Sequence, residues 1–582
     1  MTEIVMSQTP PILHGPSEKE RKYDRQLRLW AASGQAALES ANILLVNSGS
    51  GTVGVETLKN LVLPGIGRFV IYDEAKVGEA DLGVNFFLVE GSLGKPRSQS
   101  LTGHLLELNP EVQGGWYPNE NIKTLESLLA DSPVFTTIMY THPITPENIS
   151  LLESYGQQHQ TPLVAIHSAG FYSYFRINLP GAFPIVDTHP DETATTDLRL
   201  LTPWPELVAF TEELTKNIDD LSDFEHGHLP YVVILLHYLE KWKAEHGGSY
   251  PSTYKEKTEF RRIVQNAART KNTEGGEENF EEAAAAVLKT LVVPSLPSGL
   301  KEIFEYEHTH LAEQNSGFWV IADAVKAFYE EHKCLPLPGK VPDMKAQSKV
   351  YIQLQNIYKA KARKDAAEIL ETVQATPGGQ NIDPAEVDLF CKNAAFVKLI
   401  NATTGTISRE DCLKKVAGEF HNTPSLSMVV NTRNPSLFWP LQTSIGRVKE
   451  ELSDKSAIFA TPRNTAQEFA NDENAEMTLQ PLSLLPIYLA MQATAHVEDW
   501  PSKEEILARV VKMVPGADEN ERVRQAVEEV TRAEGGELHN VAALTGGMVA
   551  QETIKIITKQ YIPIDNTCVF DGINSRCQVL RL

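Results

Sequence analysis

Three glycines and one aspartate have the spacing of a site for a phosphate-bearing ligand. Gly49, Gly51 and Gly54 form a Gly-x-Gly-x-x-Gly turn, and Asp73 follows 22 residues after Gly51. Glycines let the backbone approach phosphate oxygens, the following helix offers free N–H groups, and an acidic side chain can accept hydrogen bonds from ribose hydroxyls. The same turn also occurs without a ligand, where the glycines serve only tight strand-to-helix packing.

The residues around these glycines predict the elements that would position them. Short apolar runs at 43–46 and 69–72 are typical of buried parallel strands, and the amphipathic pattern between them stops at Pro64. Apolar runs at 134–140 and 163–167 indicate further strands. We therefore expect an α/β, Rossmann-like fold. A free-standing NAD-dependent oxidoreductase is one interpretation of this fold, although no constellation for hydride transfer follows in the chain.

Composition limits the class of protein. The 582 residues contain 53 Lys and Arg against 76 Asp and Glu, a formal charge of −23. At about 100–200 residues per domain, two to four domains are expected. The acid excess argues against a nucleic-acid partner, because binding phosphate backbones requires clustered cations. No apolar run is long enough for a membrane span and no apolar signal core opens the chain, so we expect a soluble intracellular protein with no membrane partner.

The cysteines predict neither disulfides nor a zinc site. No Cys-x-x-Cys pair occurs, and five cysteines cannot form a disulfide framework for a chain of this length. Their contexts are apolar or helical, which favours buried, inert thiols over a catalytic nucleophile. The five are Cys334, Cys391, Cys412, Cys568 and Cys577.

Further motifs lie along nearly the whole chain. The principal ones are Tyr-Asp-Arg-Gln-Leu-Arg-Leu-Trp at 23–30, Leu-Val-Leu-Pro-Gly-Ile-Gly at 61–67, Asn-Phe-Phe-Leu at 85–88, Ala-Leu-Thr-Gly-Gly at 543–547 and Gln-Glu-Thr-Ile-Lys at 551–555, with shorter ones at 254–257, 278–282, 342–344 and 354–356. Together they resemble the adenylation domains of ubiquitin-like-modifier activating enzymes. The several hundred residues between the two parts make the chain most similar to regulatory, non-catalytic subunits of the heterodimeric Nedd/Rub-type enzymes.

The resemblance implies a ThiF/MoeB-like adenylation pseudo-domain split by a large, mainly helical insertion. We expect a flexible N-terminus at 1–22, the first Rossmann segment at 23–186, the insertion at 187–481 and the second segment at 482–582. The insertion is expected to be similar to a catalytic-cysteine domain without the catalytic cysteine. Within it, helical patterns lie at 231–242, 281–291, 319–329, 345–370 and 386–400.

Active halves of this family carry charged residues that this chain lacks. A second aspartate is replaced by Ala75, an arginine by Val84 and a lysine by Arg97, and Thr-His-Pro at 141–143 stands where a metal-holding aspartate would follow a strand. Losing one such preorganised charge typically costs ~10²–10³ in rate. The resemblance therefore implies a pseudoenzyme with no cofactor or metal of its own, a vestigial glycine turn and Asp73, and ATP and Mg²⁺ bound by the catalytic partner subunit.

One arginine is expected to take part in the chemistry. By resemblance, the segment carrying Arg25 reaches the partner's ATP phosphates in trans, as an arginine finger does. The alternative is that Arg21, Lys22, Arg25 and Arg28 form a solvated basic helix face while Trp30 packs inward.

A second expectation concerns the partner interface. We predict a helix cap at Pro342-Asp343 and contact between the catalytic subunit and five residues of this segment, the alternative being packing inside the helical domain. The five are Asp343, Met344, Tyr351, Leu354 and Asn356. His226 and His228, near Asp220 and Glu225, have metal-ligand chemistry but are expected to be solvated loop side chains.

The resemblance implies a regulatory subunit that completes an ATP-dependent heterodimer. Its expected partners are the catalytic subunit and a ubiquitin-like modifier of the Nedd/Rub type, whose conjugation to cullins the heterodimer initiates. Three alternatives remain open: an NAD-dependent oxidoreductase, a regulatory subunit for the SUMO-type modifier, and a scaffold that contacts no active site.

Overall fold

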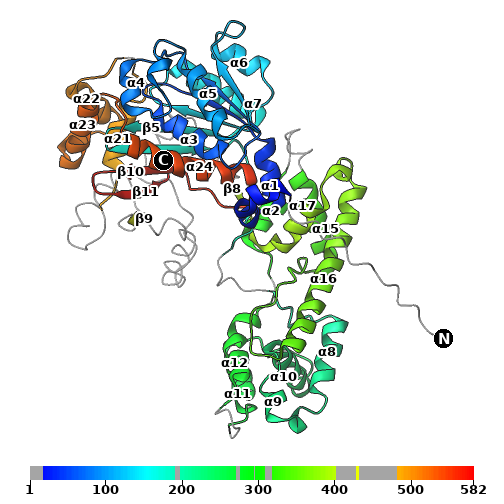
Figure 1. Cartoon of the computed structure of the whole chain (residues 1–582). Helices are drawn as coiled ribbons and strands as arrows, with labels where there is room; N and C mark the ends of the chain where they lie inside the picture. The colour runs from blue at the N-terminus through cyan, green and yellow to red at the C-terminus, as the bar shows by residue number, and fades with distance from the viewer. Residues whose placement is uncertain are drawn as a thin grey trace. The chain divides into compact units, whose positions relative to one another are not determined.

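The computed structural model divides the chain into two compact units (Figure 1). Unit 1 combines Met1–Ile185 with Ile400–Leu582, and unit 2 is Val186–Leu399. The expected insertion reached residue 481, whereas unit 2 ends at Leu399. The structure describes residues 17–190, 197–270, 276–293, 295–307, 317–400, 428–431, 482–497 and 499–582. No helix in these ranges is long and apolar enough to cross a membrane.

Unit 1 is built on a nine-stranded mixed sheet, which confirms the predicted Rossmann-like α/β class. The strand order is β3-β2-β1-β4-β5-β6-β10-β11-β9. The first five strands in this order are parallel and the remaining pairings are antiparallel. The strands are β1 (Asn42–Val46), β2 (Arg68–Tyr72), β3 (Gln113–Tyr117), β4 (Thr137–Thr141), β5 (Leu163–Ala169), β6 (Tyr172–Asn178), β9 (Met428–Asn431), β10 (Thr567–Asp571) and β11 (Arg576–Leu580), with β7 (Phe183–Val186) outside the sheet.

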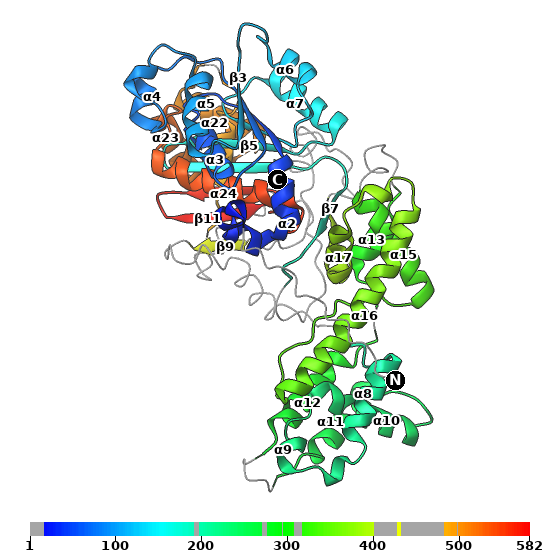
Figure 2. The same cartoon turned by 45° about the vertical axis from the view of Figure 1, so that its right-hand side comes forward.

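Helices cover both faces of the parallel part of the sheet (Figure 2). Because successive strand residues point to opposite faces, Ile43 and Leu45 of β1 pack with α3 and α24, whereas Leu44 and Val46 pack with α6 and α7. Both faces are therefore apolar, as parallel sheets require. The helices of unit 1 are α1 (Glu18–Lys22), α2 (Asp24–Ser40), α3 (Thr52–Val62), α4 (Glu79–Val84), α5 (Arg97–Leu108), α6 (Leu125–Asp131), α7 (Pro146–His159), α21 (Leu485–Gln492), α22 (Lys503–Met513), α23 (Glu521–Ala533) and α24 (His539–Thr558).

The N-terminal segment is ordered earlier than expected. Residues up to 22 were expected to be flexible, but Glu18–Lys22 forms α1; residues 1–16 lie outside the described ranges. Ser17 and Glu20 form a reciprocal capping box at the start of this helix. At its end, the Lys22 ammonium contacts Glu111 Oε2 at 3.0 Å. One local and one long-range contact thus accompany a helical turn that hydrophobicity alone does not predict.

Helices α3 and α24 can pack closely because residue 546 of α24, at their contact, is a glycine. A Cβ on Gly546 would lie 2.8 Å from the Cβ of Glu56 and 2.8 Å from the backbone nitrogen of Thr57. The neighbouring Thr545 hydroxyl shares a 2.6 Å hydrogen bond with Ser173 on β6. The Thr-Gly pair thus joins α24 to both the glycine-turn helix and the sheet.

Unit 2 is helical and organised along one long helix, α16. In Figures 1 and 2, α8, α10, α11 and α12 surround one half of α16, and α13, α15 and α17 lie beside the other half. Buried Leu354 and Tyr358 pack α16 into the hydrophobic core that it shares with α8, α10, α11 and α12. The elements are α8 (Pro205–Thr215), α9 (Asp223–His226), α10 (Tyr231–Glu245), α11 (Tyr254–Asn266), α12 (Glu278–Thr290), α13 (Ser298–Glu305), α15 (Gly317–His332), α16 (Ser348–Ala375), α17 (Pro384–Lys392) and β8 (Val397–Ile400).

All five helices expected in this region are present, but the fifth prediction is wrong at its C-terminal end. The pattern at 386–400 predicts one helix, but α17 ends at Lys392 and Val397–Ile400 is a strand. Burial alternates there, with Val397 buried and Lys398 exposed, which is the period of a strand. The cap expected at 342–343 is also wrong, because α16 begins only at Ser348.

Substitution of Gly546 by alanine should destabilise unit 1, since the added methyl group would meet backbone atoms of α3 that cannot move aside. Overpacking of this kind typically costs about 1–3 kcal/mol. Gly547→Ala in the same helix is a matched control, because its Cβ would meet nothing within 4 Å. That substitution should be neutral or raise stability by up to ~1 kcal/mol through helix propensity. Thermal and urea unfolding of both variants measure the difference; equal effects would contradict the packing argument.

Candidate functional site

The glycine turn connects β1 to α3, and its glycines are required by a neighbouring side chain. Gly51 has a left-handed backbone (φ +63°) and forms the N-cap of α3. A Cβ on Gly51 would overlap the side chain of Asn47, and one on Gly54 would lie 2.7 Å from Asn47 Oδ1. Gly49 is also left-handed, at φ +59°. The turn therefore has a structural need for all three glycines even without a ligand.

Asp73 lies at the end of β2, where a ribose-binding acid is expected, but its oxygens are already in use. The Arg97 guanidinium donates two hydrogen bonds, Nε to Oδ2 at 2.7 Å and Nη2 to Oδ1 at 3.1 Å. Asn47 Nδ2 donates to Oδ2 at 2.8 Å, and the Ala75 N–H donates to Oδ1 at 3.0 Å. A carboxylate has about four acceptor sites, so none remains for a ribose hydroxyl.

Arg97 itself is committed to acidic groups within the chain. It occupies the position at which the family resemblance expects a phosphate-binding lysine, yet it is 3% exposed and also donates to Asp81 Oδ1 at 3.0 Å. Burial lowers the pKa of the Arg97 guanidinium, but Asp73 and Asp81 together outweigh this effect and raise it, so the arginine stays charged. The cation expected for phosphate thus neutralises the acid expected for ribose.

The amino terminus of α3, where a phosphate would lie, is filled by the side chain of Glu537. The Val53 N–H donates to Glu537 Oε2 at 2.8 Å. Burial raises the pKa of Glu537 to about 8, while the backbone N–H groups of Val53, Thr52 and Gly51 and the charge of Arg97 act in the opposite direction. An in-chain carboxyl group therefore meets the free N–H groups that make such a helix end an anion site.

The segment that carries Glu537 is fixed over the turn by further contacts. The Ser50 hydroxyl donates to the Gly535 carbonyl at 3.2 Å, and the Gly170 N–H donates to the Gly536 carbonyl at 2.8 Å. Sequence reasoning missed Glu537, which lies 484 residues from Val53. No local pattern in the sequence signals a contact over that distance.

The remaining positions of an active half hold no suitable groups. Val84 replaces the expected arginine, and its carbonyl contacts His539 Nδ1 at 2.9 Å. In place of a metal-holding aspartate after β4, His142 contacts the Ala495 carbonyl through Nδ1 at 2.8 Å. Its ring centroid lies 5.2 Å from that of His167 and 5.6 Å from that of His496. The residues at this switch point of the sheet do not fit an ATP–magnesium complex.

The N-terminal segment presents two of its arginines, Arg21 and Arg25, without a partner among the described residues. Tyr23 is 2% exposed, and Arg25 lies exposed on the first turn of α2. Arg28 pairs with Asp24 at 3.0 Å. Within the described ranges, Arg25 and Arg21 have neither a hydrogen-bond nor an ion-pair partner. The basic face is therefore solvated, as in the alternative interpretation. Lys22 and Arg28 are paired with carboxylates of the same chain, whereas Arg21 and Arg25 are not paired within the described ranges.

The predicted partner-contact residues in unit 2 divide into two groups. Met344 and Leu354 are 8% and 0% exposed and pack in the core of unit 2, so the interface prediction is wrong for both. Tyr351 is half-buried, and its hydroxyl donates to a backbone carbonyl of the same unit at 3.2 Å. Asp343 and Asn356 are exposed. The burial of Leu354 and Met344 favours the alternative of packing inside the helical domain, although Ile352 on helix α16 is 54% exposed.

The histidines of the α9 region also differ from expectation. His226 was expected in a solvated loop, but it is 3% exposed, contacts Glu277 Oε1 at 2.7 Å through Nδ1 and stacks on Phe280. His228 is half-buried, and its Nδ1 contacts the Phe224 carbonyl at 2.8 Å. His226 joins two helices of unit 2, and no carboxylate cluster surrounds it among the described residues.

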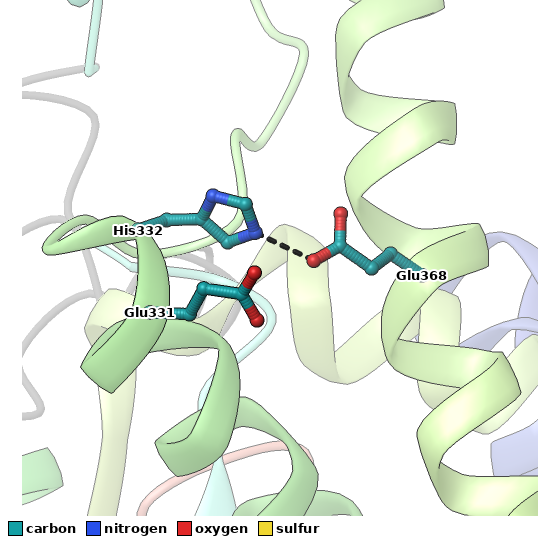
Figure 3. A group of neighbouring side chains, drawn as sticks. All are labelled: Glu331, His332 and Glu368. Atoms are coloured by element: carbon teal, nitrogen blue, oxygen red, sulfur yellow. Dashed lines mark hydrogen bonds and ion pairs between the residues drawn. The ribbon is translucent and has the colours of Figure 1, made fainter.

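One group with metal-ligand chemistry lies elsewhere in unit 2 (Figure 3). Glu331 and His332 at the end of α15 face Glu368 of α16, and His332 Nε2 contacts Glu368 Oε1 at 2.5 Å. Two ligands of one tetrahedral zinc ion with bonds of about 2.0–2.2 Å lie roughly 3.3 Å apart. The direct histidine–glutamate contact therefore fits an ion pair between two helices rather than a metal centre.

The described cysteines lack the features of a nucleophile. Cys391, Cys568 and Cys577 are buried, as predicted, and Cys334 is half-buried. Burial raises the pKa of Cys391 to about 12, which suppresses its thiolate. Cys412 lies outside the described residues.

Comparisons with known proteins match the chain almost end to end. The family model described as "ThiF family" matches residues 23–582. The Xenopus laevis protein named "NEDD8-activating enzyme E1 regulatory subunit" is 34% identical over 95% of this chain and 97% of its own length. The Arabidopsis thaliana protein named "NEDD8-activating enzyme E1 regulatory subunit AXR1" is 32% identical over 97% of each.

Solved structures match much smaller parts. A crystal structure of Escherichia coli MccB with SeMet MccA shares 17% identity and covers 28% of this chain and 50% of its own, with a TM-score of 0.25. A score this low adds nothing to the assignment.

Glu537→Ala should expose the amides at the start of α3 to solvent exchange, because their acceptor is removed. We expect hydrogen–deuterium exchange at residues 51–53 of the full chain to accelerate, with a loss of stability of about 1–3 kcal/mol for the unsatisfied groups. Glu537→Gln is the matched control, since its amide oxygen can still accept from Val53. Unchanged protection in the alanine variant would show that the carboxyl group does not hold this helix end.

The buried His167 should make an acid-sensitive contribution to the stability of unit 1. Burial lowers the pKa of His167 from 6.5 to about 3, with His496 adding to the effect. The unfolded chain binds a proton that the folded imidazole does not, so the contribution of His167 to the free energy of unfolding falls as pH drops below about 6.5, by about 2 kcal/mol at pH 5. The raised pKa of Glu537 acts with the opposite sign over the same range, so the test is the difference between two proteins. Urea unfolding of the unsubstituted chain and of His167→Gln at pH 7, 6 and 5 should show this difference change with pH; a constant difference would contradict the assignment.

Proposed function

Since the chain belongs to the ThiF family and, within it, to the NEDD8-activating enzyme E1 regulatory subunits, we propose a division of labour with a catalytic partner. The chain is the regulatory subunit of the heterodimer that activates a NEDD8-type modifier. Its own half binds no nucleotide, and the catalytic subunit holds ATP and Mg²⁺ and forms the thioester. This chain contributes the dimer scaffold and one cation in trans.

The observation that carries the first part of this proposal is the self-occupied glycine turn. Activation of a carboxylate by ATP needs cations and a metal to stabilise charge on the phosphates. In this half, Glu537 fills the phosphate position of α3, Arg97 is bound to Asp73, and no metal-holding carboxylate follows β4. Each group that a nucleotide would need is either absent or already paired, which supports a pseudoenzyme half.

Arg25 is the cation proposed to act in trans. Its guanidinium is exposed and has no partner among the described residues, so it binds a phosphate without first breaking an internal ion pair. Arg28 would have to leave Asp24, and Lys22 would have to leave Glu111. An arginine remains charged at any working pH and can present a planar fork to phosphate oxygens.

The alternative functions receive less support from the same geometry. An NAD-dependent oxidoreductase would need Asp73 free for the ribose, but both of its oxygens are saturated by protein donors. Relatives that match the full chain carry the NEDD8 name, which argues against a SUMO-type subunit. A scaffold without any contact to an active site predicts no role for Arg25 and is separated by the test below.

Arg25→Ala should leave the heterodimer assembled but slow modifier-dependent ATP–pyrophosphate exchange by ~10²-fold or more, the usual effect of removing one preorganised charge. Arg28→Ala is a matched control on the same turn, because its exposed pair with Asp24 contributes only ~0.3–0.5 kcal/mol. The measurement is ATP–pyrophosphate exchange by purified heterodimers that carry Arg25→Ala, Arg28→Ala or neither substitution.

Two results would count against the proposal in different ways. Normal exchange in the Arg25→Ala heterodimer would favour the pure scaffold. Saturable binding of ATP at micromolar concentration by the isolated chain would contradict the closed glycine turn, whatever the behaviour of Arg25.

A further inference from the structure

We propose that two tyrosine hydroxyls, one at each end of the turn that carries Arg25, position this arginine for the partner's active site. The helical turn Asp24–Leu29 is called the arginine turn below. Tyr23 precedes it directly, and Tyr561 reaches it from the segment after α24. This inference rests on the proposed role of Arg25 in trans and names the residues that act through it.

The start of the arginine turn is fixed by Tyr23. This side chain is 2% exposed; its hydroxyl donates to Glu111 Oε2 at 3.2 Å and accepts from Asn109 Nδ2 at 3.1 Å. Asn109 Nδ2 also donates to the Val62 carbonyl at 3.0 Å, which connects the phenol to the end of α3. A Cβ on Gly65 would lie 2.6 Å from the Tyr23 hydroxyl oxygen, so the Pro-Gly turn has to be glycine for the ring to fit.

The end of the arginine turn is fixed by Tyr561. Helical geometry breaks at Trp30 and Ala31, and Ala31 has φ +54° and ψ −174°, a conformation that favours glycine. The break leaves the last carbonyls of the arginine turn without helical N–H partners. Tyr561 supplies a donor, since its hydroxyl lies 3.0 Å from the Leu29 carbonyl oxygen. Tyr561 is only 8% exposed and so is itself held in the core.

A second contact stabilises the break. Trp30 is 6% exposed, and its indole Nε1 donates to Gln35 Oε1 at 3.2 Å. Gln35 Nε2 in turn donates to the Pro64 carbonyl at 3.1 Å. Both ends of the arginine turn therefore connect to the C-terminal end of α3 and the residues that follow it, through Asn109 to Val62 at one end and through Gln35 to Pro64 at the other.

This arrangement separates a rigid backbone from a free side chain. The arginine turn is held by buried groups, whereas Arg25 projects from it exposed and without a partner among the described residues. Fixing the backbone removes part of the entropic cost of placing the guanidinium against a phosphate, and small misplacements of catalytic groups are expensive. The strained Ala31 backbone, which costs about 1–3 kcal/mol, is consistent with a geometry selected for placement rather than for stability.

The alternative explanation is that both tyrosines only attach the N-terminus to unit 1. Tyr23→Phe and Tyr561→Phe, singly and together, separate the two because each removes one hydroxyl and keeps the ring. In purified heterodimers, each single variant should lower kcat for modifier-dependent pyrophosphate exchange roughly 5–10-fold, with KM for the modifier and heterodimer assembly unchanged. Hydrogen–deuterium exchange over residues 24–30 should increase in parallel.

The decisive comparison places the same substitutions in an Arg25→Ala background. If the hydroxyls act through Arg25, Tyr23→Phe should then cost less than about 2-fold, because nothing remains to be positioned. Tyr155→Phe is the matched control: it also removes a buried phenol hydroxyl from unit 1, one that accepts from the Phe135 N–H at 3.1 Å. It should leave exchange activity unchanged.

Each contrary outcome has one meaning. Normal kcat in both tyrosine variants, together with impaired Arg25→Ala, would overturn the positioning role and leave the proposed function standing. An undiminished effect of Tyr23→Phe in the Arg25→Ala background would overturn it as well, because the hydroxyl would then act through another group. Normal activity of Arg25→Ala would overturn both the arginine role and the positioning that depends on it.

Discussion

The structure of unit 1 depends on how the buried amino terminus of α3 is satisfied. A helix that begins at the middle of a parallel sheet directs unpaired N–H groups into a confined space, and they require an acceptor from a ligand, from water or from the protein. Glu537 supplies that acceptor from within the chain. This contact lies at the helix end where a parallel sheet of this kind can receive a phosphate.

The same principle extends to the charged groups around the turn. Asp73, Arg97 and Asp81 neutralise one another in a buried network, and a buried charge is tolerated only when it is paired and hydrogen-bonded. These three side chains thus satisfy one another within the chain. The exposed arginine at position 25 has the opposite character, since its backbone is tightly held and its charge is not used within the described part of the chain. Structural completeness in one region and an unused cation in another fit a subunit that works through its partner.

The sequence predicts the local parts of this arrangement well. The glycine spacing, the flanking strands and the α/β class follow from patterns a few residues long, and the missing charges at Ala75 and Val84 can be read directly. Contacts between distant segments could not be predicted in that way: Glu537 meets Val53 across 484 residues. In unit 2, helix periodicity identifies α16 but does not show that Met344, which precedes this helix, packs in the core of the unit. The buried His226–Glu277 pair likewise has no sequence signature, because it lies in a region rich in polar residues.

The composition of unit 1 from both ends of the chain has a consequence for biosynthesis. Strand β6 pairs with β10, residue 172 opposite residue 571, so the sheet is continuous only after residue 571 has been translated. The helical unit between them is finished almost two hundred residues earlier and can fold while the ribosome is still elongating. The face of the first strands that α24 covers therefore stays partly uncovered until that helix has been made, whereas α6 and α7 can cover the other face early. A chain that terminates early would lack β10, β11 and α24 together, and its N-terminal half would be a substrate for chaperones and proteases rather than a smaller version of the protein.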